Sequence, residues 1–175
     1  MALLQENCMD FLAISYYNSN VVSKAKNSMA IGDSIRNPYL AANPWGWTIN
    51  PLGLYDCFLR YWDRYQKPLM IAENGFGQIE SLNDRNELND DYRIDYLREH
   101  LRAILKAIRH GVEVFAYCAW SPIDMVSSGT SEMKKRYGFI YVDQDDYGKG
   151  SHKRYCKASY YWYQKVIQTN GKSIE

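Results

Sequence analysis

Apolar residues occur along this chain in short continuous runs and in stripes with helical spacing. Three runs predict β-strands, at residues 10–17, 68–72 and 112–120. Apolar positions three and four residues apart predict α-helices over about residues 51–67, 90–110 and 157–169. A fourth, shorter strand is predicted in the stretch FIYVD, residues 139–143. Each of the first three strands is therefore followed by a helix.

This alternation predicts parallel βα units and places the chain in the α/β class. A closed barrel of eight such units takes about 250 residues, whereas this chain has 175 residues and shows three predicted units. The pattern therefore predicts one domain, which is either a small open α/β sheet or a part of a barrel.

Composition and charge remove several classes of function. The net charge of +1 gives no electrostatic reason to expect nucleic acid or an anionic membrane as a partner. No apolar run approaches the roughly 20 residues of a membrane span. The four cysteines lack the CxxC spacing of zinc sites, which predicts no metal and a reduced, cytoplasmic setting. No secretory leader is predicted, because Gln5 and Glu6 follow Leu3 and Leu4 at once.

Polar and aromatic residues stand at the ends of the three predicted strands, where functional groups of α/β sheets gather. They are Tyr16 and Tyr17, Glu73 and Asn74, and Trp120 and Ser121. An indole can stack on a pyranose, hydroxyl and amide groups can bind its oxygens, and a carboxylate can react with it. Each residue alone is more often structural, but the three strand ends together favour a sugar-binding cleft.

The stretch IAENGFG, residues 71–77, resembles the nucleophile signature of glycoside hydrolase family 1. DFLAISYYNS resembles the sixth barrel strand of that family, and NPWGWTINPLGL the loop and helix before its seventh strand. AYCAWSPIDMVSSGTSEMKKRYGFIYVD resembles the eighth strand with the segment after it, and KASYYWYQKVI the closing helix. The resemblance implies that residues 1–175 form a single partial domain, the C-terminal portion of a (β/α)8 TIM barrel with strands 6–8.

The acid/base motif that the family carries at its fourth strand, T-x-N-E-P, does not occur in this sequence. The other Asn-Glu dipeptide, Asn86–Glu87, lies in a predicted polar loop. The resemblance thus implies that about five βα units lie outside this chain. The isolated chain is expected to be inactive and to self-associate through the open edge of the strand at residues 10–17.

Retaining glycosidases use two carboxylates about 5 Å apart, one as nucleophile and one as acid/base. By the resemblance, Glu73 is the nucleophile and Tyr17 orients it. Trp120 forms part of the floor of the glycone site, and Trp47 lies near the aglycone side. The resemblance implies neither a metal nor a cofactor.

The loop after Trp120 indicates which sugar is bound. Family members that act on unmodified glucosides typically carry a Glu-Trp pair where this chain has Ser127 and Ser128. Lys135 and Tyr137 match the K-x-Y element that members specific for 6-phosphorylated sugars use against the phosphate. The resemblance therefore implies retaining hydrolysis of 6-phospho-β-D-glucosides, with a 6-phosphorylated β-glucoside as the partner. Without the resemblance, Lys134, Lys135 and Arg136 would be interpreted as a solvated basic loop.

Two alternatives stay open. The first is a 6-phospho-β-galactosidase or a dual-specificity phospho-glycosidase, although the galactoside enzymes tend to carry Trp at the position of Ser128. The second is a non-catalytic phosphosugar-binding fragment, which the missing acid/base motif favours.

Overall fold

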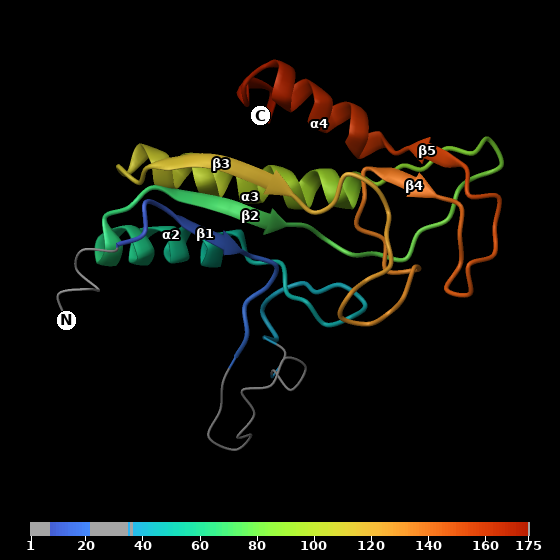
Figure 1. Ribbon diagram of the computed structural model, residues 1–175, viewed down its shortest axis with the longest axis horizontal. Helices are drawn as coiled ribbons and strands as arrows, with labels where there is room; N and C mark the ends of the chain where they lie inside the picture. The colour runs from blue at the N-terminus through green and yellow to red at the C-terminus, as the bar shows by residue number, and fades with distance from the viewer. Residues whose placement is uncertain (1–7, 22–34, 36, 175) are drawn as a thin grey trace.

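The central sheet consists of three parallel strands in the order β1–β2–β3 (Figure 1). The structure is a computed structural model that describes residues 8–21, 35 and 37–174. The strands are β1 (Leu12–Ser15), β2 (Leu69–Asn74) and β3 (Val114–Ala119). The three predicted strands are thus confirmed, with shorter outer strands than predicted. The prediction about a secretory leader rests on residues 3–6, which lie outside the described residues.

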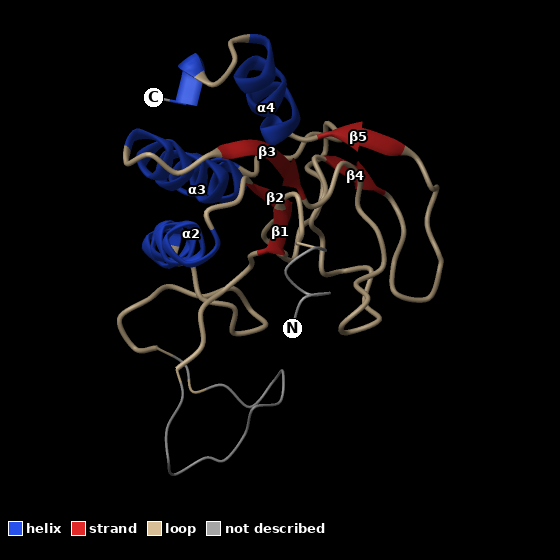
Figure 2. Ribbon diagram, turned by 60° about the vertical axis from the view of Figure 1, so that its left-hand side comes forward, coloured by secondary structure: helices blue, strands red, loops and turns tan. Residues whose placement is uncertain are grey.

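Two helices cover one face of this sheet (Figure 2). The first, α2 (Pro51–Tyr65), begins where the side-chain oxygen of Asn50 accepts a hydrogen bond from the Gly53 backbone N–H, at 2.9 Å. The second, α3 (Asp91–Arg109), ends just before Gly111, which has a left-handed φ of 88°. The buried core between helices and sheet contains Tyr16, Leu54, Phe58, Leu69, Ile71, Leu101, Ile104 and Ala107.

The segment after β3 forms a short antiparallel pair and then a helix beside α3. The pair is β4 (Ile140–Val142) and β5 (Arg154–Cys156), and the helix is α4 (Ala158–Gln168), followed by the short 3-10 helix η1 (Lys172–Ile174). β4 and α4 confirm the prediction. β5 is not predicted, because it has only three residues, of which Arg154 and Cys156 are exposed, and so shows no alternation of apolar and polar positions.

Within the described residues, no helix is both long and apolar enough to cross a membrane.

Glu73 and Asn74 are the last residues of β2, not the first residues of the loop after it. The predicted strand stops at residue 72 because the apolar run stops there. Backbone pairing nevertheless continues, since Glu73 lies opposite Ser15 of β1 and Asn74 lies opposite Ala119 of β3. The sheet itself therefore holds the residue that carries the carboxylate.

A histidine is buried between α3 and the sheet. His100 is fully buried, and its Nδ1 lies 2.7 Å from the backbone oxygen of Tyr96, to which it donates. Its ring packs on those of Tyr96 and Tyr16, with centroid distances of 3.9 and 5.9 Å. Its Nε2 is buried without a hydrogen-bond partner among the described residues. Burial lowers the pKa of His100 to about 4, against the opposing effects of the Tyr96 oxygen and Glu99.

We expect this histidine to make the fold sensitive to mild acid. Because its pKa is lowered from 6.5 to about 4 on folding, its stabilising contribution is complete above pH 6.5 and is lost as the pH falls toward 4. The loss amounts to about 2–3 kcal/mol. Urea unfolding of the wild type and of His100→Asn at pH 7 and pH 4.5 measures it, and the variant should lose less stability between the two pH values. His152→Gln, at an exposed histidine, is the control. Equal losses in the wild type and His100→Asn would contradict the assignment.

Candidate active site

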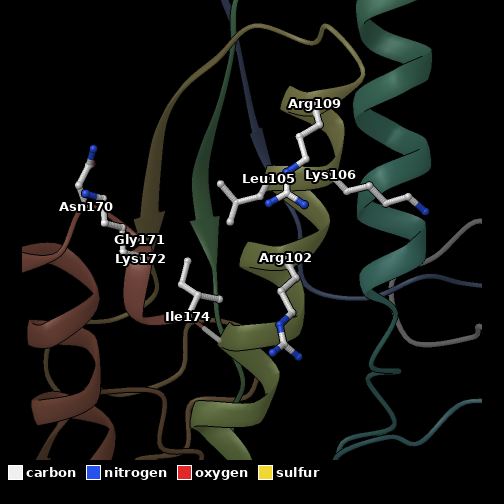
Figure 3. Close-up of a pocket in the computed structure, with 8 residues that line it drawn as sticks. All are labelled: Arg102, Leu105, Lys106, Arg109, Asn170, Gly171, Lys172 and Ile174. Carbon is white, nitrogen blue, oxygen red and sulfur yellow. The ribbon is translucent and has the colours of Figure 1, made fainter.

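Long loops gather beyond the carboxyl ends of the strands (Figure 1), and the predicted site residues lie at the ends of β1–β3 or on the loops after them. A different hollow, of about 890 Å³, lies between α3 and the C-terminal segment (Figure 3). It is lined by Arg102, Leu105, Lys106, Arg109, Asn170, Gly171, Lys172 and Ile174. None of these is a predicted site residue. The residues that α3 contributes lie in the C-terminal half of this helix, which leads to the start of β3 and not to its carboxyl end. The candidate site is therefore the group of side chains at the strand ends and not this hollow.

Glu73 is hydrogen-bonded to a tyrosine from the neighbouring strand. Tyr17 stands two residues beyond the end of β1, and its hydroxyl donates to Oε2 of Glu73 at 2.8 Å. Burial raises the pKa of Tyr17 well above its usual value, and the hydrogen bond to Glu73 raises it further. The phenol thus stays protonated and remains a hydrogen-bond donor to Oε2. Oε1 of Glu73 does not take part in this hydrogen bond.

Asn74 and Tyr16 do not face the cleft, contrary to the prediction. The Asn74 side chain is fully buried, and its amide nitrogen donates to the Tyr16 backbone oxygen at 2.6 Å and to the Tyr96 hydroxyl at 2.9 Å. Its oxygen accepts a hydrogen bond from the Tyr117 hydroxyl at 2.7 Å. The Tyr16 hydroxyl in turn donates to the backbone oxygen of Asn50 at 2.7 Å. Both residues therefore fix the end of β2 next to Glu73, and neither offers a free polar group to a sugar.

Trp120 lies directly against the glycine that follows the Glu-Asn pair. Its backbone N–H donates to the Asn74 backbone oxygen at 2.8 Å. A Cβ placed on Gly75 would overlap the Trp120 carbonyl oxygen. Ser121, which follows Trp120, is buried, and its hydroxyl donates to the Ile123 backbone oxygen at 2.7 Å. Half-buried Trp120 is thus positioned by its backbone, whereas Ser121 is structural.

Lys135 is buried among aromatic rings, so the interpretation of residues 134–136 as a solvated basic loop is wrong for it. Only 1% of the residue is exposed. Its Nζ lies 3.8 Å from the ring centroid of Trp47, 5.1 Å from that of Trp45 and 5.6 Å from that of Tyr137. Among the described residues, no carboxylate oxygen lies within 4.0 Å of this ammonium. Burial lowers the pKa of Lys135, partly offset by the nearby charge of Glu132.

The neighbouring Lys134 behaves as a surface residue. Its side chain is 52% exposed, and its Nζ pairs with Glu132 at 2.7 Å and with Asp146 at 3.6 Å. Hydrogen bonds from Lys134, and from Trp45 at 2.8 Å, hold the pKa of Glu132 at about 2. The two adjacent lysines therefore differ in burial and in partners, which makes them a matched pair for experiments.

The loop after β3 brings a serine and a tyrosine to the same place. Ser127 and Tyr137 are both buried. Burial raises the pKa of Tyr137, and the neighbouring Ser127 hydroxyl partly opposes this effect. Ser128, in contrast, is exposed.

Trp47 connects the Tyr17–Glu73 pair to Lys135 and Tyr137. Its ring centroid lies 5.2 Å from that of Tyr17 and 6.2 Å from that of Tyr137. The structure therefore brings Glu73, Tyr17, Trp47, Lys135, Tyr137 and Ser127 into one continuous set of contacts. It places Trp47 against Lys135, while the predicted aglycone role of Trp47 stays a prediction.

The sequence does not predict a network of six buried, ion-paired side chains next to this set. They are Glu80, Asp90, Arg93, Asp124, Arg136 and Lys157. One signal could have revealed a member, because Arg93 falls on the apolar stripe of α3 at the spacing of Leu97, Leu101 and Ile104. No group of histidine, cysteine and acidic side chains within the described residues could hold a metal ion.

Fold and site together define the class of protein. Three βα units in parallel order, with a carboxylate at the end of the middle strand, form a partial (β/α)8 barrel that carries a candidate glycosidase site. The family model of glycosyl hydrolase family 1 matches residues 1–172. The chain belongs to this family.

Relatives and solved structures agree with this assignment. The chain is 48% identical to aryl-phospho-β-D-glucosidase BglH of Bacillus subtilis (strain 168), over 98% of this chain and 38% of the relative. It is 49% identical to 6-phospho-β-glucosidase AscB of Escherichia coli (strain K12), over 97% of this chain and 37% of the relative. The β-glucosidase from Thermotoga maritima in complex with glucoimidazole aligns with a TM-score of 0.80 and 30% identity, over 95% of this chain and 36% of that structure. The chain thus spans less than two fifths of the length of these proteins.

We expect Gly75→Ala to destabilise the fold, because the added methyl group would overlap the backbone of Trp120. The cost should be about 1–3 kcal/mol, the usual range for overpacking. Gly129→Ala is the matched control, since a Cβ there meets nothing within 4 Å. Urea unfolding of both variants measures the difference. A Gly75→Ala variant as stable as Gly129→Ala would show that the two segments are not in close contact.

Proposed function

We propose that this chain is the part of a retaining 6-phospho-β-glucosidase that carries the nucleophile and binds the phosphate. The observation that carries the proposal is the buried ammonium of Lys135, which has no carboxylate partner within 4.0 Å in the described part of the chain. Trp47 links it to the Tyr17–Glu73 pair. A buried cation is unfavourable unless an anion compensates it, and the phosphate of the substrate is the anion we assign to it.

In this proposal Glu73 attacks the anomeric carbon and forms a glycosyl-enzyme. Tyr17 donates to Oε2, so Oε1 is the oxygen that attacks. A second carboxylate must protonate the leaving oxygen and then activate water. That carboxylate lies outside the 175 residues of this chain, which spans 37–38% of the two relatives.

The 6-phosphate would lie at Lys135, Tyr137 and Ser127. The ammonium supplies the charge, and the phosphate in turn favours its protonated form. Because burial raises the pKa of Tyr137, its phenol stays protonated and can donate to a phosphate oxygen. The hydroxyls of Ser127 and of exposed Ser128 are further donors. In addition, no acidic side chain stands at the two serine positions, so none repels the anion there.

Two indoles would bind the sugar itself. Trp120 follows the end of β3 and is half-buried, so one part of its side chain is accessible. We assign it to the glycone floor, because an indole packs on the apolar face of a pyranose. We assign Trp47 to the aglycone side, with the additional task of holding the Lys135 ammonium on its ring at 3.8 Å.

The phosphate assignment predicts a difference between two adjacent lysines. Lys135→Ala should weaken the binding of glucose 6-phosphate to the 175-residue chain by about 1.5–3 kcal/mol, since a charge-assisted hydrogen bond is lost. Lys134→Ala should change it little, because Lys134 is paired on the surface with Glu132 and Asp146. Calorimetric titration, or quenching of tryptophan fluorescence, gives the affinities, with unphosphorylated glucose as the ligand control. Equal effects of the two substitutions would refute the assignment.

The chain by itself should not turn over nitrophenyl β-glucoside 6-phosphate, because it has a nucleophile but no acid/base partner. Added βα units from a family member should restore turnover, and an activated 2-fluoro glycoside should then label Glu73. Ordinary turnover by the chain alone, or a label on another acid, would contradict the mechanism.

Light scattering is expected to show self-association of the chain, because β1 and β3 are the outer strands of the described sheet. A monodisperse monomer would contradict the expectation about the strand edges.

A further inference from the structure

One buried guanidinium contacts both of the loops that form the proposed site. Arg93, near the start of α3, is 2% exposed. Its Nη1 donates to the backbone oxygen of Phe76 at 2.6 Å and to that of Tyr137 at 2.8 Å. Its Nη2 donates to the backbone oxygen of Arg136 at 3.2 Å. Phe76 follows Glu73 by three residues, and Arg136 and Tyr137 follow Lys135 directly.

The two loops are also paired with each other at this point. The backbones of Gln78 and Arg136 exchange two hydrogen bonds of 3.0 Å. A Cβ placed on Gly77 would lie 2.9 Å from Cγ of Lys135. The position of Lys135 relative to Glu73 therefore depends on how firmly these two backbone segments are held together.

Carboxylates keep the guanidinium in place. Nε of Arg93 donates to Asp90 at 2.9 Å, and Nη2 is paired with Glu80. Glu80 also accepts a hydrogen bond from Lys157 at 2.5 Å. All of these side chains are buried, so the guanidinium has little freedom to leave the two loops.

We propose that Arg93 is a positioning residue that fixes the loop of Lys135 and Tyr137 against the loop that follows Glu73. The role of Lys135 toward phosphate rests on the proposed function, whereas the contacts of Arg93 do not. A planar guanidinium can donate to three carbonyls and two carboxylates at once, and an ammonium on a flexible stem cannot. The inference is therefore that the shape of Arg93, and not only its charge, sets the position of Lys135.

The adjacent lysines provide a readout that needs no ligand. In the wild type, an amine-acylating reagent should modify half-exposed Lys134 and spare buried Lys135. We expect Arg93→Lys, which keeps the charge, and Arg93→Met, which removes it, both to raise the Lys135:Lys134 modification ratio about tenfold or more, since buried carbonyls left unpaired favour local opening. Mass spectrometry with fragment-ion localisation gives the ratio.

Two controls on the same helix separate positioning from loss of stability. Arg102→Lys changes a surface arginine whose partner is Glu99, and Leu101→Ala removes packing from a core cluster to which no residue of the two loops belongs. Both should keep the ratio of the wild type, even where the thermal unfolding temperature of Leu101→Ala falls as far as that of Arg93→Lys. A wild-type ratio in Arg93→Lys would overturn the inference, because charge alone would then suffice. A raised ratio in Leu101→Ala would overturn it as well, because any destabilisation would then expose Lys135.

A binding measurement tells this inference apart from the proposed function. Glucose 6-phosphate should bind Arg93→Lys at least about tenfold more weakly than the wild type, and Arg102→Lys as well as the wild type. If the wild type does not bind glucose 6-phosphate but the modification ratio still rises in Arg93→Lys, the proposed function fails and the positioning role stands. If the wild type binds and Arg93→Lys binds equally well with an unchanged ratio, the positioning role fails and the proposed function stands.

Discussion

A balanced set of buried charges holds the loops of this chain in place. Three cations, Arg93, Arg136 and Lys157, are paired with three carboxylates, Glu80, Asp90 and Asp124, and all six side chains are at most 6% exposed. Burying a charge is costly unless it is paired and fully hydrogen-bonded. Each partner of this set therefore constrains the others, and the loss of one would leave a buried charge uncompensated.

Lys135 stands next to this set without belonging to it. It is as buried as the three paired cations, but aromatic rings surround its ammonium where the others have carboxylates. Rings stabilise a cation less than a carboxylate does, so Lys135 is the buried cation with most to gain from an added anion. The paired charges thus tie the loop to its neighbours, and Lys135, which has no carboxylate partner in the described part of the chain, gives the loop its proposed chemistry.

The sequence was informative where structure is local. Helices and strands follow from apolar spacing, and the Glu-Asn-Gly stretch follows from a short motif. What escaped prediction depends on distant partners. Asn74 looks like a cleft residue, yet its amide is hydrogen-bonded to three tyrosines, of which one directly follows β1, one lies in α3 and one lies in β3. Lys157 and Glu80 form a buried pair although 77 residues separate them, and nothing in either neighbourhood predicts such a contact. The residues of β5 form a strand only because β4 lies beside them.

The proposed function distributes binding and catalysis unequally along the barrel of which this chain is a part. Glu73, its tyrosine partner and all of the proposed phosphate contacts lie on strands β1–β3 and the loops after them. Contacts within these 175 residues connect them, among them the hydrogen bonds of Arg93 to Phe76 and Tyr137 and those of Asn74 to Tyr16 and Tyr117. The proton donor that a retaining mechanism also needs is separate from this set. In the proposed function, recognition of the phosphate therefore belongs to this portion of the fold, whereas turnover requires a carboxylate that another portion supplies.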